Sequence, residues 1–172
     1  MVALLTVNSP KHAAVAERCR AIAESARSLC DELLRLVDED AGAFDRVSAA
    51  YRLKKGDDRE KAARSAAIQE ALAGAISPPA SVIELARGVC DLAVELADIG
   101  NPNALSDIGC AALCAQASAR GAALNVDVNA NSLRDRDAAA RHLARAARDV
   151  AQVDVLCEVI LSTLRAKTQA PT

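Results

Sequence analysis

The scarcity of aromatic side chains is the feature that most constrains how this chain can fold. Among 172 residues only Phe44 and Tyr51 are aromatic, whereas close to a quarter are alanine and 52% are hydrophobic. Alanine, leucine, arginine and glutamate favour helices, while sheets draw on aromatic residues that are almost absent here. The composition therefore predicts an all-α fold, in which small side chains let the helices approach one another closely.

Five breaks rich in proline, glycine, asparagine and aspartate divide the chain into helical segments. These breaks are NSP at 8–10, KKGDD at 54–58, SPP at 77–79, GNPN at 100–103 and NANSLRD at 129–135. The predicted helices between them are 1–7, 12–53, 58–76, 80–99, 105–128 and 134–166. A chain of this length most simply forms one domain. We therefore expect residues 1–172 to make a single multihelical bundle of about five long helices.

Charge and hydropathy argue against two classes of partner. The formal charge of −2 is spread along the chain, and no basic block or group of aromatic side chains suggests a nucleic-acid surface. The longest apolar runs, such as MVALLTV at 1–7, fall far short of the roughly 20 residues that span a bilayer. We expect a cytoplasmic protein with neither nucleic-acid nor membrane partners.

The cysteines suggest core thiols rather than a metal site. None of the six forms a C-x-x-C pair, and each stands among apolar helical neighbours; they are Cys19, Cys30, Cys90, Cys110, Cys114 and Cys157. Cys110 and Cys114 share a helix face, but the chain has only two histidines with which to complete a four-ligand site. We therefore expect reduced thiols and no bound metal.

Three consecutive acids at 38–40 differ in where a helix would place them. At about 100° per residue, Asp40 falls within roughly 40° of an apolar stripe, whereas Asp38 points nearly opposite and Glu39 lies about a quarter turn away. The stripe consists of Leu29, Leu33, Leu36, Phe44, Val47 and Tyr51. An acid among apolar side chains has a raised pKa, which suits general acid-base catalysis, unless a cation compensates it or the stripe opens onto solvent.

A second polar line follows one face of the predicted helix at 105–128. It consists of Asp107, Cys114, Ser118, Gly121, Asn125 and Asn129. Such a face either lets two helices approach closely or leaves room for a ligand held by asparagine amides. Ser106 and Asp107 also fit the ordinary start of a helix. Lys54, Lys55 and Arg64 flank the KKGDD turn, where they either attract an anionic ligand or are simply solvated.

Four stretches, in order, resemble one known family. They are LVDEDAGAF at 36–44, AYRLKKGDDREKAARSAAIQEALAGAISPP at 50–79, GNPNALSDIG at 100–109 and ALNVDVN at 123–129. Together they are similar to the cyclodeaminase/cyclohydrolase family, which comprises the C-terminal half of formiminotransferase-cyclodeaminase and the stand-alone bacterial methenyltetrahydrofolate cyclohydrolases. The resemblance covers nearly the whole chain, and the last two stretches look most like the cyclohydrolases.

The resemblance implies a multihelical, homodimeric enzyme of folate one-carbon metabolism. Its substrate would be a tetrahydrofolate derivative, with no further cofactor. The implied reaction is hydrolysis of 5,10-methenyltetrahydrofolate to 10-formyltetrahydrofolate. The alternatives are a lyase that releases ammonia from 5-formiminotetrahydrofolate, an inactive binding or assembly homologue, and a relative acting on another substrate. The family's catalytic aspartate falls at Asp40, and its binding positions match Lys55, Arg64, Asn103, Ser106, Asp107, Asn125 and Asn129.

The chain also departs from the family pattern at its start. Members usually carry a Gly-rich segment that leads into a helix ending in M-V-x-x-L-T, and residues 1–6 match only that ending. We therefore expect a segment to be missing upstream, with activity in doubt if that segment lines the folate site. Lys54 replaces the family's usual proline, which loosens the turn before Lys55.

Overall fold

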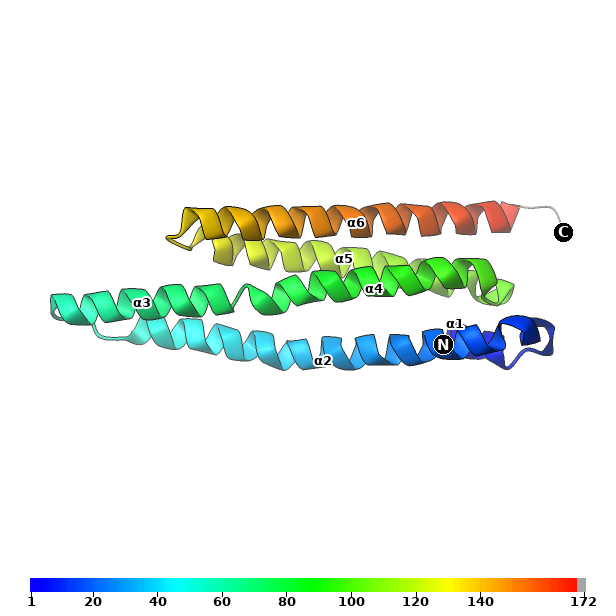
Figure 1. Cartoon of the computed structure of the whole chain (residues 1–172), viewed down its shortest axis with the longest axis horizontal. Coiled ribbons are helices and arrows are strands. Elements are labelled where there is room, and N and C mark those ends of the chain that lie inside the picture. The colour runs from blue at the N-terminus through cyan, green and yellow to red at the C-terminus, as the bar shows by residue number, and fades with distance from the viewer. Residues whose placement is uncertain (170–172) are drawn as a thin grey trace.

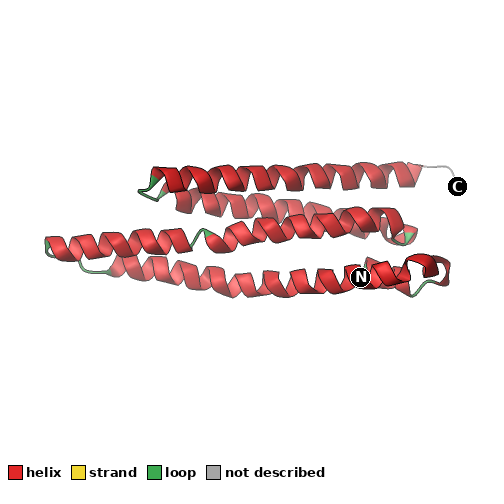
Figure 2. Ribbon diagram, viewed as in Figure 1, coloured by secondary structure: helices red, strands yellow, loops and turns green. Residues whose placement is uncertain are grey.

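The computed structural model describes residues 1–169, and every regular element within that range is helical (Figures 1 and 2). The elements are α1 (Val2–Val7), the 3-10 helix η1 (Pro10–Val15), α2 (Ala16–Arg52), α3 (Asp58–Gly74), α4 (Ser77–Ile99), the 3-10 helix η2 (Pro102–Ala104), α5 (Leu105–Asn131) and α6 (Arg136–Gln169). The predicted all-α class and the five long helices are confirmed.

Several helix boundaries differ from those predicted. Pro78 and Pro79 lie inside the first turn of α4 rather than before it. Proline is tolerated there because the first N–H groups of a helix have no partner within the helix. In addition, α2 begins at Ala16 after the η1 turn, and α5 continues through Val128 to Asn131.

The central helix is α4, which packs against α2, α5 and α6 (Figure 1). Fully buried branched side chains fill the space around it: Ile83, Ile108, Val126, Val153 and Ile160. Between them lie buried alanines that let α4 and α5 approach closely: Ala86, Ala93, Ala97, Ala112, Ala115 and Ala119. The hairpin of α2 and α3 projects beyond the ends of α5 and α6.

The KKGDD turn joins α2 to α3, and two hydrogen bonds hold it against the first turn of α3. Asp57 caps α3 by accepting from the Glu60 N–H at 2.7 Å, and the Glu60 carboxylate accepts from the Gly56 N–H at 2.9 Å. The first bond satisfies a backbone donor that the start of α3 leaves free, and the second ties Gly56 of the turn to the first turn of that helix. The turn predicted from the sequence is therefore confirmed.

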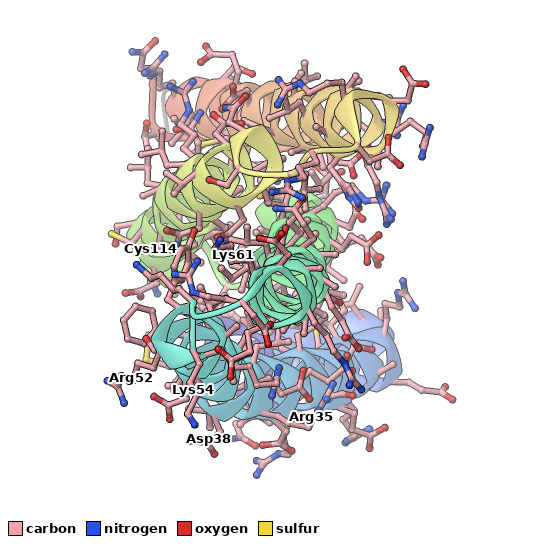
Figure 3. The ribbon with its side chains drawn as sticks, turned by 90° about the vertical axis from the view of Figure 1, so that its left-hand side faces the viewer. Arg35, Asp38, Arg52, Lys54, Lys61 and Cys114 are labelled. Atoms are coloured by element: carbon pink, nitrogen blue, oxygen red, sulfur yellow. The ribbon has the colours of Figure 1, made fainter. Side chains whose placement is uncertain are left out.

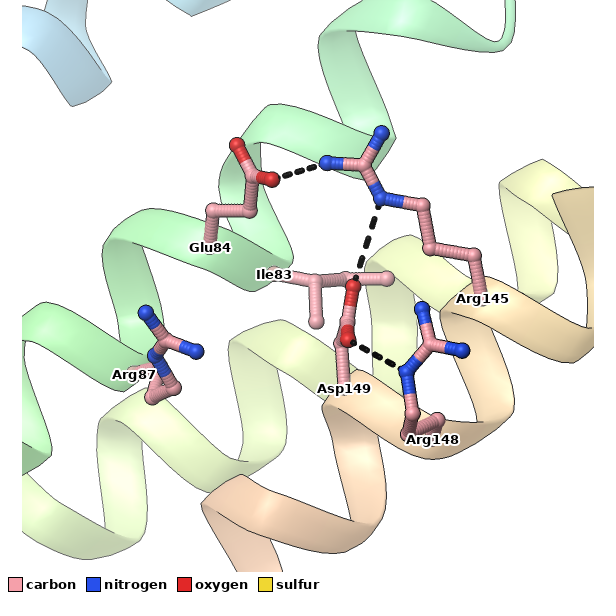
Figure 4. A pocket seen from close by; sticks show the side chains of 6 residues that line it. All are labelled: Ile83, Glu84, Arg87, Arg145, Arg148 and Asp149. Atoms are coloured by element: carbon pink, nitrogen blue, oxygen red, sulfur yellow. Dashed lines mark hydrogen bonds and ion pairs between the residues drawn. The ribbon is translucent and has the colours of Figure 1, made fainter.

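Charged side chains pair with one another along the seam where α4 meets α6 (Figure 4). Arg145 pairs with Glu84 and also lies 3.5 Å from Asp149, while Arg148 approaches Asp149 at 3.6 Å. Arg87 donates to Gln152 at 3.1 Å. These partly exposed contacts orient the two helices more than they stabilise them, because exposed ion pairs contribute at most about 1 kcal/mol each.

A further ion pair joins α5 to α6. Arg120 donates to both carboxylate oxygens of Asp154 at 3.0 Å, and Gln116 donates to one of them at 2.8 Å. The hydrogen bond from Arg120 lowers the pKa of Asp154 below its ordinary value. On this side, α5 is therefore bound to its neighbour by directed polar contacts as well as by packing.

The prediction that all six cysteines are core thiols was wrong for half of them. Cys19, Cys90 and Cys157 are buried, whereas Cys30, Cys110 and Cys114 are exposed, and all six are unpaired. Some of the large apolar side chains near the exposed three, such as Leu34 on α2 and Leu113 on α5, are exposed as well. Apolar neighbours in the sequence therefore do not by themselves show that a cysteine side chain is buried.

Within residues 1–169, no helix is both long enough and apolar enough to cross a membrane.

Candidate functional site

A long groove runs between α2 and α5 over the side chains of α4. Its volume is about 1060 Å³. The floor is formed by Val89, Leu92, Ala93 and Leu96 of α4. The walls come from α2, between Arg20 and Val37, and from the start of α5, including Asp107 and Ala111. Met1, Val2, Ala3 and Leu4 also line the groove. The groove is therefore mostly apolar, with Asp107 toward one end.

Asp40 lies on α2 just under one turn beyond Val37, the last residue of that helix to line the groove. The apolar side chains around Asp40 are buried on one side of it and exposed on the other. Leu36 and Ala43 are buried on one side, whereas Val37 and Phe44 are 65% and 69% exposed on the other. Asp40 stands at this border and is itself exposed. A single chain therefore lacks the burial that we expected around Asp40.

The other two acids of the DED run are helix surface, as predicted. Glu39 pairs with Arg35 one turn earlier on α2, with both side chains substantially exposed. Asp38 is exposed, and Figure 3 shows it on the outer side of α2, away from the other helices. Asp40 is therefore the only acid of the three next to the uncovered apolar flank.

Asn129 and Asn125 lie on the part of α5 nearest to Asp40. Asn129 donates to the carbonyl of Ala75, directly after α3, at 3.0 Å. Because α3 runs antiparallel to α2, with Arg64 beside Tyr51, Ala75 lies level with Asp40 along the bundle. Asn125 is exposed one turn away on the same face of α5. The structure thus brings these two amides to the height of Asp40.

Lys55 and Arg64 lie farther out on the projecting hairpin. Arg64 donates to the Tyr51 carbonyl at 3.0 and 3.3 Å, and its guanidinium carbon lies 5.6 Å from the centroid of the Tyr51 ring. This contact satisfies a carbonyl at the end of α2 and fixes the angle of α3. Lys55 stands exposed in the turn itself. Both cations are more than one helical turn from Asp40.

The remaining predicted residues, Asn103, Ser106 and Asp107, lie at the opposite end of the groove. Asp107 lines it beside Leu96, and the adjacent Glu95 pairs with Arg18 near the start of α2. At a rise of about 1.5 Å per residue, Asp107 is therefore about 33 Å from the level of Asp40. Ser106 lies within the first turn of α5 and does not cap it. One chain thus carries two separate polar clusters.

The loop that carries this second cluster is held by Thr6, which was not among the predicted site residues. Its hydroxyl donates to the Val2 carbonyl and accepts from the Asn101 N–H, both at 2.9 Å. Asn101 in turn accepts from the Asn103 N–H at 3.0 Å. Gly100 is required there because a Cβ would lie 2.4 Å from the Leu96 carbonyl. The signal in the sequence was a lone hydroxyl within the apolar run at 1–7.

Among residues 1–169, no three histidine, cysteine, aspartate or glutamate side chains gather as the ligands of a metal ion would.

Comparison with known proteins identifies the family. Residues 1–148 match the family model of formiminotransferase-cyclodeaminase. The chain belongs to this family. The methenyltetrahydrofolate cyclohydrolase of Methylorubrum extorquens is 41% identical over 167 residues, which cover 97% of this chain and 80% of that protein. The resemblance drawn from the four sequence stretches is therefore confirmed.

Two other members show how widely the fold is used. The crystal structure of formiminotetrahydrofolate cyclodeaminase from Thermotoga maritima is 25% identical, with a TM-score of 0.84 over 96% of this chain and 79% of that one. Formimidoyltransferase-cyclodeaminase of Rattus norvegicus is 35% identical over 100 residues, which are 58% of this chain but 18% of that protein. The helical domain thus occurs both alone and within a much longer enzyme.

Proposed function

We propose that this protein hydrolyses 5,10-methenyltetrahydrofolate to 10-formyltetrahydrofolate. The observation that carries the proposal is the 41% identity to a methenyltetrahydrofolate cyclohydrolase along 97% of the chain. The groove supports it, since it is large enough for a folate-sized ligand and mostly apolar, Asp107 lines it, and Asp40 lies just under one turn beyond Val37, its last lining residue on α2. The reaction adds water to the methenyl carbon and breaks its bond to N5, releasing one proton overall.

Asp40 is the general acid and base in this proposal. It accepts a proton from the attacking water and donates a proton to N5 as that nitrogen leaves, so one carboxyl group serves two successive steps. Its position at the edge of an apolar flank favours the role. A substrate lying over Val37 and Phe44, which are 65% and 69% exposed, would remove water from the carboxylate. Loss of water favours the protonated form and eases proton exchange.

The amides level with Asp40 are proposed to orient the substrate. Asn125 offers a donor and an acceptor, which match the amide edge of a pterin or a formyl oxygen. Asn129 already uses its Nδ2 on the Ala75 carbonyl, so its Oδ1 is the atom offered to substrate. Lys55 and Arg64, on the projecting hairpin, are proposed to attract the carboxylates of the folate's glutamate portion.

We propose further that the enzyme is a cytoplasmic homodimer, forms a single domain, and needs no cofactor besides its tetrahydrofolate substrate. Six unpaired cysteines suit a reducing compartment. A dimer would give the second cluster of Asn103, Ser106 and Asp107 a place in the same chemistry, since these residues are too far from Asp40 to act with it in one chain.

A second candidate is formiminotetrahydrofolate cyclodeaminase, because the Thermotoga maritima structure that shares this fold carries that title. In this reaction N10 attacks the formimino carbon and the departing ammonia takes a proton. Asp40 could supply that proton as readily as it serves the hydrolysis. The two reactions therefore share a site and differ in substrate.

Two assays with the purified protein separate these candidates. The first follows the loss of the near-ultraviolet absorbance of 5,10-methenyltetrahydrofolate above its spontaneous hydrolysis. The second follows the appearance of that absorbance, together with ammonia, from 5-formiminotetrahydrofolate. We expect acceleration in the first assay only. Acceleration in the second alone would replace our proposal with cyclodeaminase, and none in either would refute both.

A further inference from the structure

A second cavity lies over the seam of α4 and α6, apart from the groove. We call it the seam cavity, and its volume is about 200 Å³. On α4, Arg87 of this cavity and Val89 of the groove floor are about 200° apart around the helix, so the two hollows lie on opposite sides of α4. The lining residues are Ile83, Glu84 and Arg87 of α4 and Arg145, Arg148 and Asp149 of α6 (Figure 4).

Positive charge is in excess at the seam cavity. Its three arginines face only two carboxylates, Glu84 and Asp149, and the first of these already pairs with Arg145. The surrounding stretch of α6 and the turn before it add to the excess, because residues 134–148 contain five arginines and two aspartates although the whole chain has a formal charge of −2. A hollow with this charge attracts anions.

The arginines of the cavity have hydrogen-bond donors to spare. A guanidinium group carries five N–H donors. Arg87 donates to the neutral amide oxygen of Gln152 at 3.1 Å. Arg145 and Arg148 approach Asp149 at 3.5 and 3.6 Å, which is longer than a directed hydrogen bond. These loose ion pairs therefore leave most of the N–H groups available to a ligand.

The guanidinium groups stand on two sides of the cavity. Figure 4 shows Arg87 on one side of Asp149, with Arg145 and Arg148 on the other. A guanidinium group binds a pair of phosphate oxygens well, because its fork of donors matches their spacing. A diphosphate group, in which one oxygen joins two phosphoryl groups, offers such a pair to each side. A single phosphate or carboxylate would satisfy only one side.

A further hollow of about 220 Å³ continues the seam cavity toward the start of α4. The two share Ile83, Glu84, Arg145 and Asp149. This second hollow adds the polar side chains of Ser77, Ser81 and His142 over the buried side chains of Ile76, Val126 and Ala146. Together the two hollows reach the lower end of the size range of small-molecule sites, roughly 300 Å³. An organic group attached to the diphosphate would therefore have both room and polar partners.

We propose that the seam of α4 and α6 binds an organic diphosphate. The diphosphate group lies in the seam cavity between Arg87 and Arg148, and the organic part follows the seam toward Ser81 and His142. No residue of either hollow lines the groove beside Asp40, so this site is independent of the proposed hydrolysis.

The site is tested by calorimetric titration of the purified protein with inorganic pyrophosphate at constant ionic strength and without divalent cations. Arg87→Gln and Arg148→Gln are compared with Arg35→Gln, which removes the same charge from an exposed ion pair on α2. Circular dichroism first shows that all three are folded. We expect wild type and Arg35→Gln to bind equally and each seam variant to bind about tenfold more weakly or worse. No binding to wild type, or equal weakening in all three variants, would overturn the proposal.

Two further titrations separate the parts of the ligand. Orthophosphate, at twice the molar concentration, is expected to bind at least about tenfold more weakly than pyrophosphate. Equal binding would refute the need for two phosphoryl groups. Adenosine diphosphate is expected to bind more tightly than pyrophosphate and to lose that advantage in His142→Ala. Weaker binding of adenosine diphosphate would overturn the place of the organic part and leave inorganic pyrophosphate as the ligand.

Discussion

The two sides of the bundle differ in how far their side chains are covered or paired by neighbouring helices. Across the seam of α4 and α6, Glu84 meets Arg145, Arg87 meets Gln152, and buried Ile83 fills the space beneath them. Across the groove between α2 and α5, Phe44 and Leu124 stand 69% and 66% exposed without cover. Side chains on the first side therefore pair across the two helices, although Val155 there is 64% exposed, whereas the second side leaves several large apolar side chains of α2 and α5 exposed. The candidate catalytic residue lies on the open side.

The same contrast exists within α5 alone. Its inner face packs small residues such as Ala112 and Ala119 against α4, and Arg120 ties it to Asp154 of α6. Its outer face presents Leu113, Leu124 and Val128 to solvent. A helix with apolar residues on most of its circumference is suited to burial on all sides. α5 is thus buried on its inner face and exposes large apolar side chains on its outer face.

The largest expected difference between the two sides is in stability. Ile83→Ala opens a cavity in a fully buried site and is expected to lower the free energy of unfolding by about 2–5 kcal/mol. Val37→Ala removes similar atoms from the open face, so in dilute protein, where only monomer is present, it is expected to cost less than about 0.5 kcal/mol. Urea unfolding of both variants at low concentration measures the difference. Equal losses would show that the α2 face is buried in the monomer.

Alkaline pH is expected to lower the stability of the folded protein through the buried thiol of Cys90 on α4. Burial, with smaller contributions from Cys157 and Asp91, raises the pKa of Cys90 from 9.0 to about 11. The folded protein therefore keeps this proton where the unfolded chain loses it, and stability present below pH 9 falls as the pH rises toward 11. Thermal unfolding followed between pH 8 and pH 11 should show this decline, and it should be smaller in Cys90→Ala. An identical decline in the variant would remove Cys90 as its cause.

Labelling of the cysteine thiols at constant pH compares the exposed cysteines with the buried ones. Cys30, Cys110 and Cys114 are exposed, whereas Cys19, Cys90 and Cys157 are buried. In dilute native protein at pH 8 we expect three thiols to react with a chromogenic disulfide within minutes and three only on unfolding. Rapid labelling of a fourth thiol in the native protein would contradict this division between exposed and buried cysteines.

The smallest expected effect is at the ion pairs of the seam. Glu84→Gln removes the partner of Arg145, but both side chains are about half exposed. The loss of stability is therefore expected to be below about 1 kcal/mol and to shrink at high salt. Unfolding in low and high sodium chloride measures it. A loss of several kcal/mol would mean that this polar seam, rather than the apolar core, holds α4 to α6.

Much of the fold could be predicted because its signals are local. The KKGDD turn carries its own capping residues, so Asp57 and Glu60 close it without help from the rest of the chain. The spacing on α2 separated Asp40 from Asp38 correctly. Asp107 and Asn129 share one face of α5, but helical rise alone also implies that they lie far apart along that helix.

The rest depends on how the helices pack, which spacing does not reveal. Periodicity placed Phe44 in an apolar stripe, and Cys114 stands among apolar neighbours in the sequence, but whether such residues meet another helix of the same chain is decided by tertiary structure. That Asp40 lies level with Asn129 follows from the antiparallel packing of α3 on α2 and the Asn129–Ala75 contact. The role of Thr6 could not be predicted because Asn101, which donates to its hydroxyl, is brought beside it only by the fold.

The central claim is that Asp40 exchanges protons in the hydrolysis of 5,10-methenyltetrahydrofolate. The direct test is the rate of absorbance loss with wild type, Asp40→Asn and the matched surface variant Asp38→Asn. We predict that wild type and Asp38→Asn accelerate the decay equally and that Asp40→Asn is slower by about 10²-fold or more, the usual contribution of a general acid or base. A wild-type rate in Asp40→Asn would contradict the account.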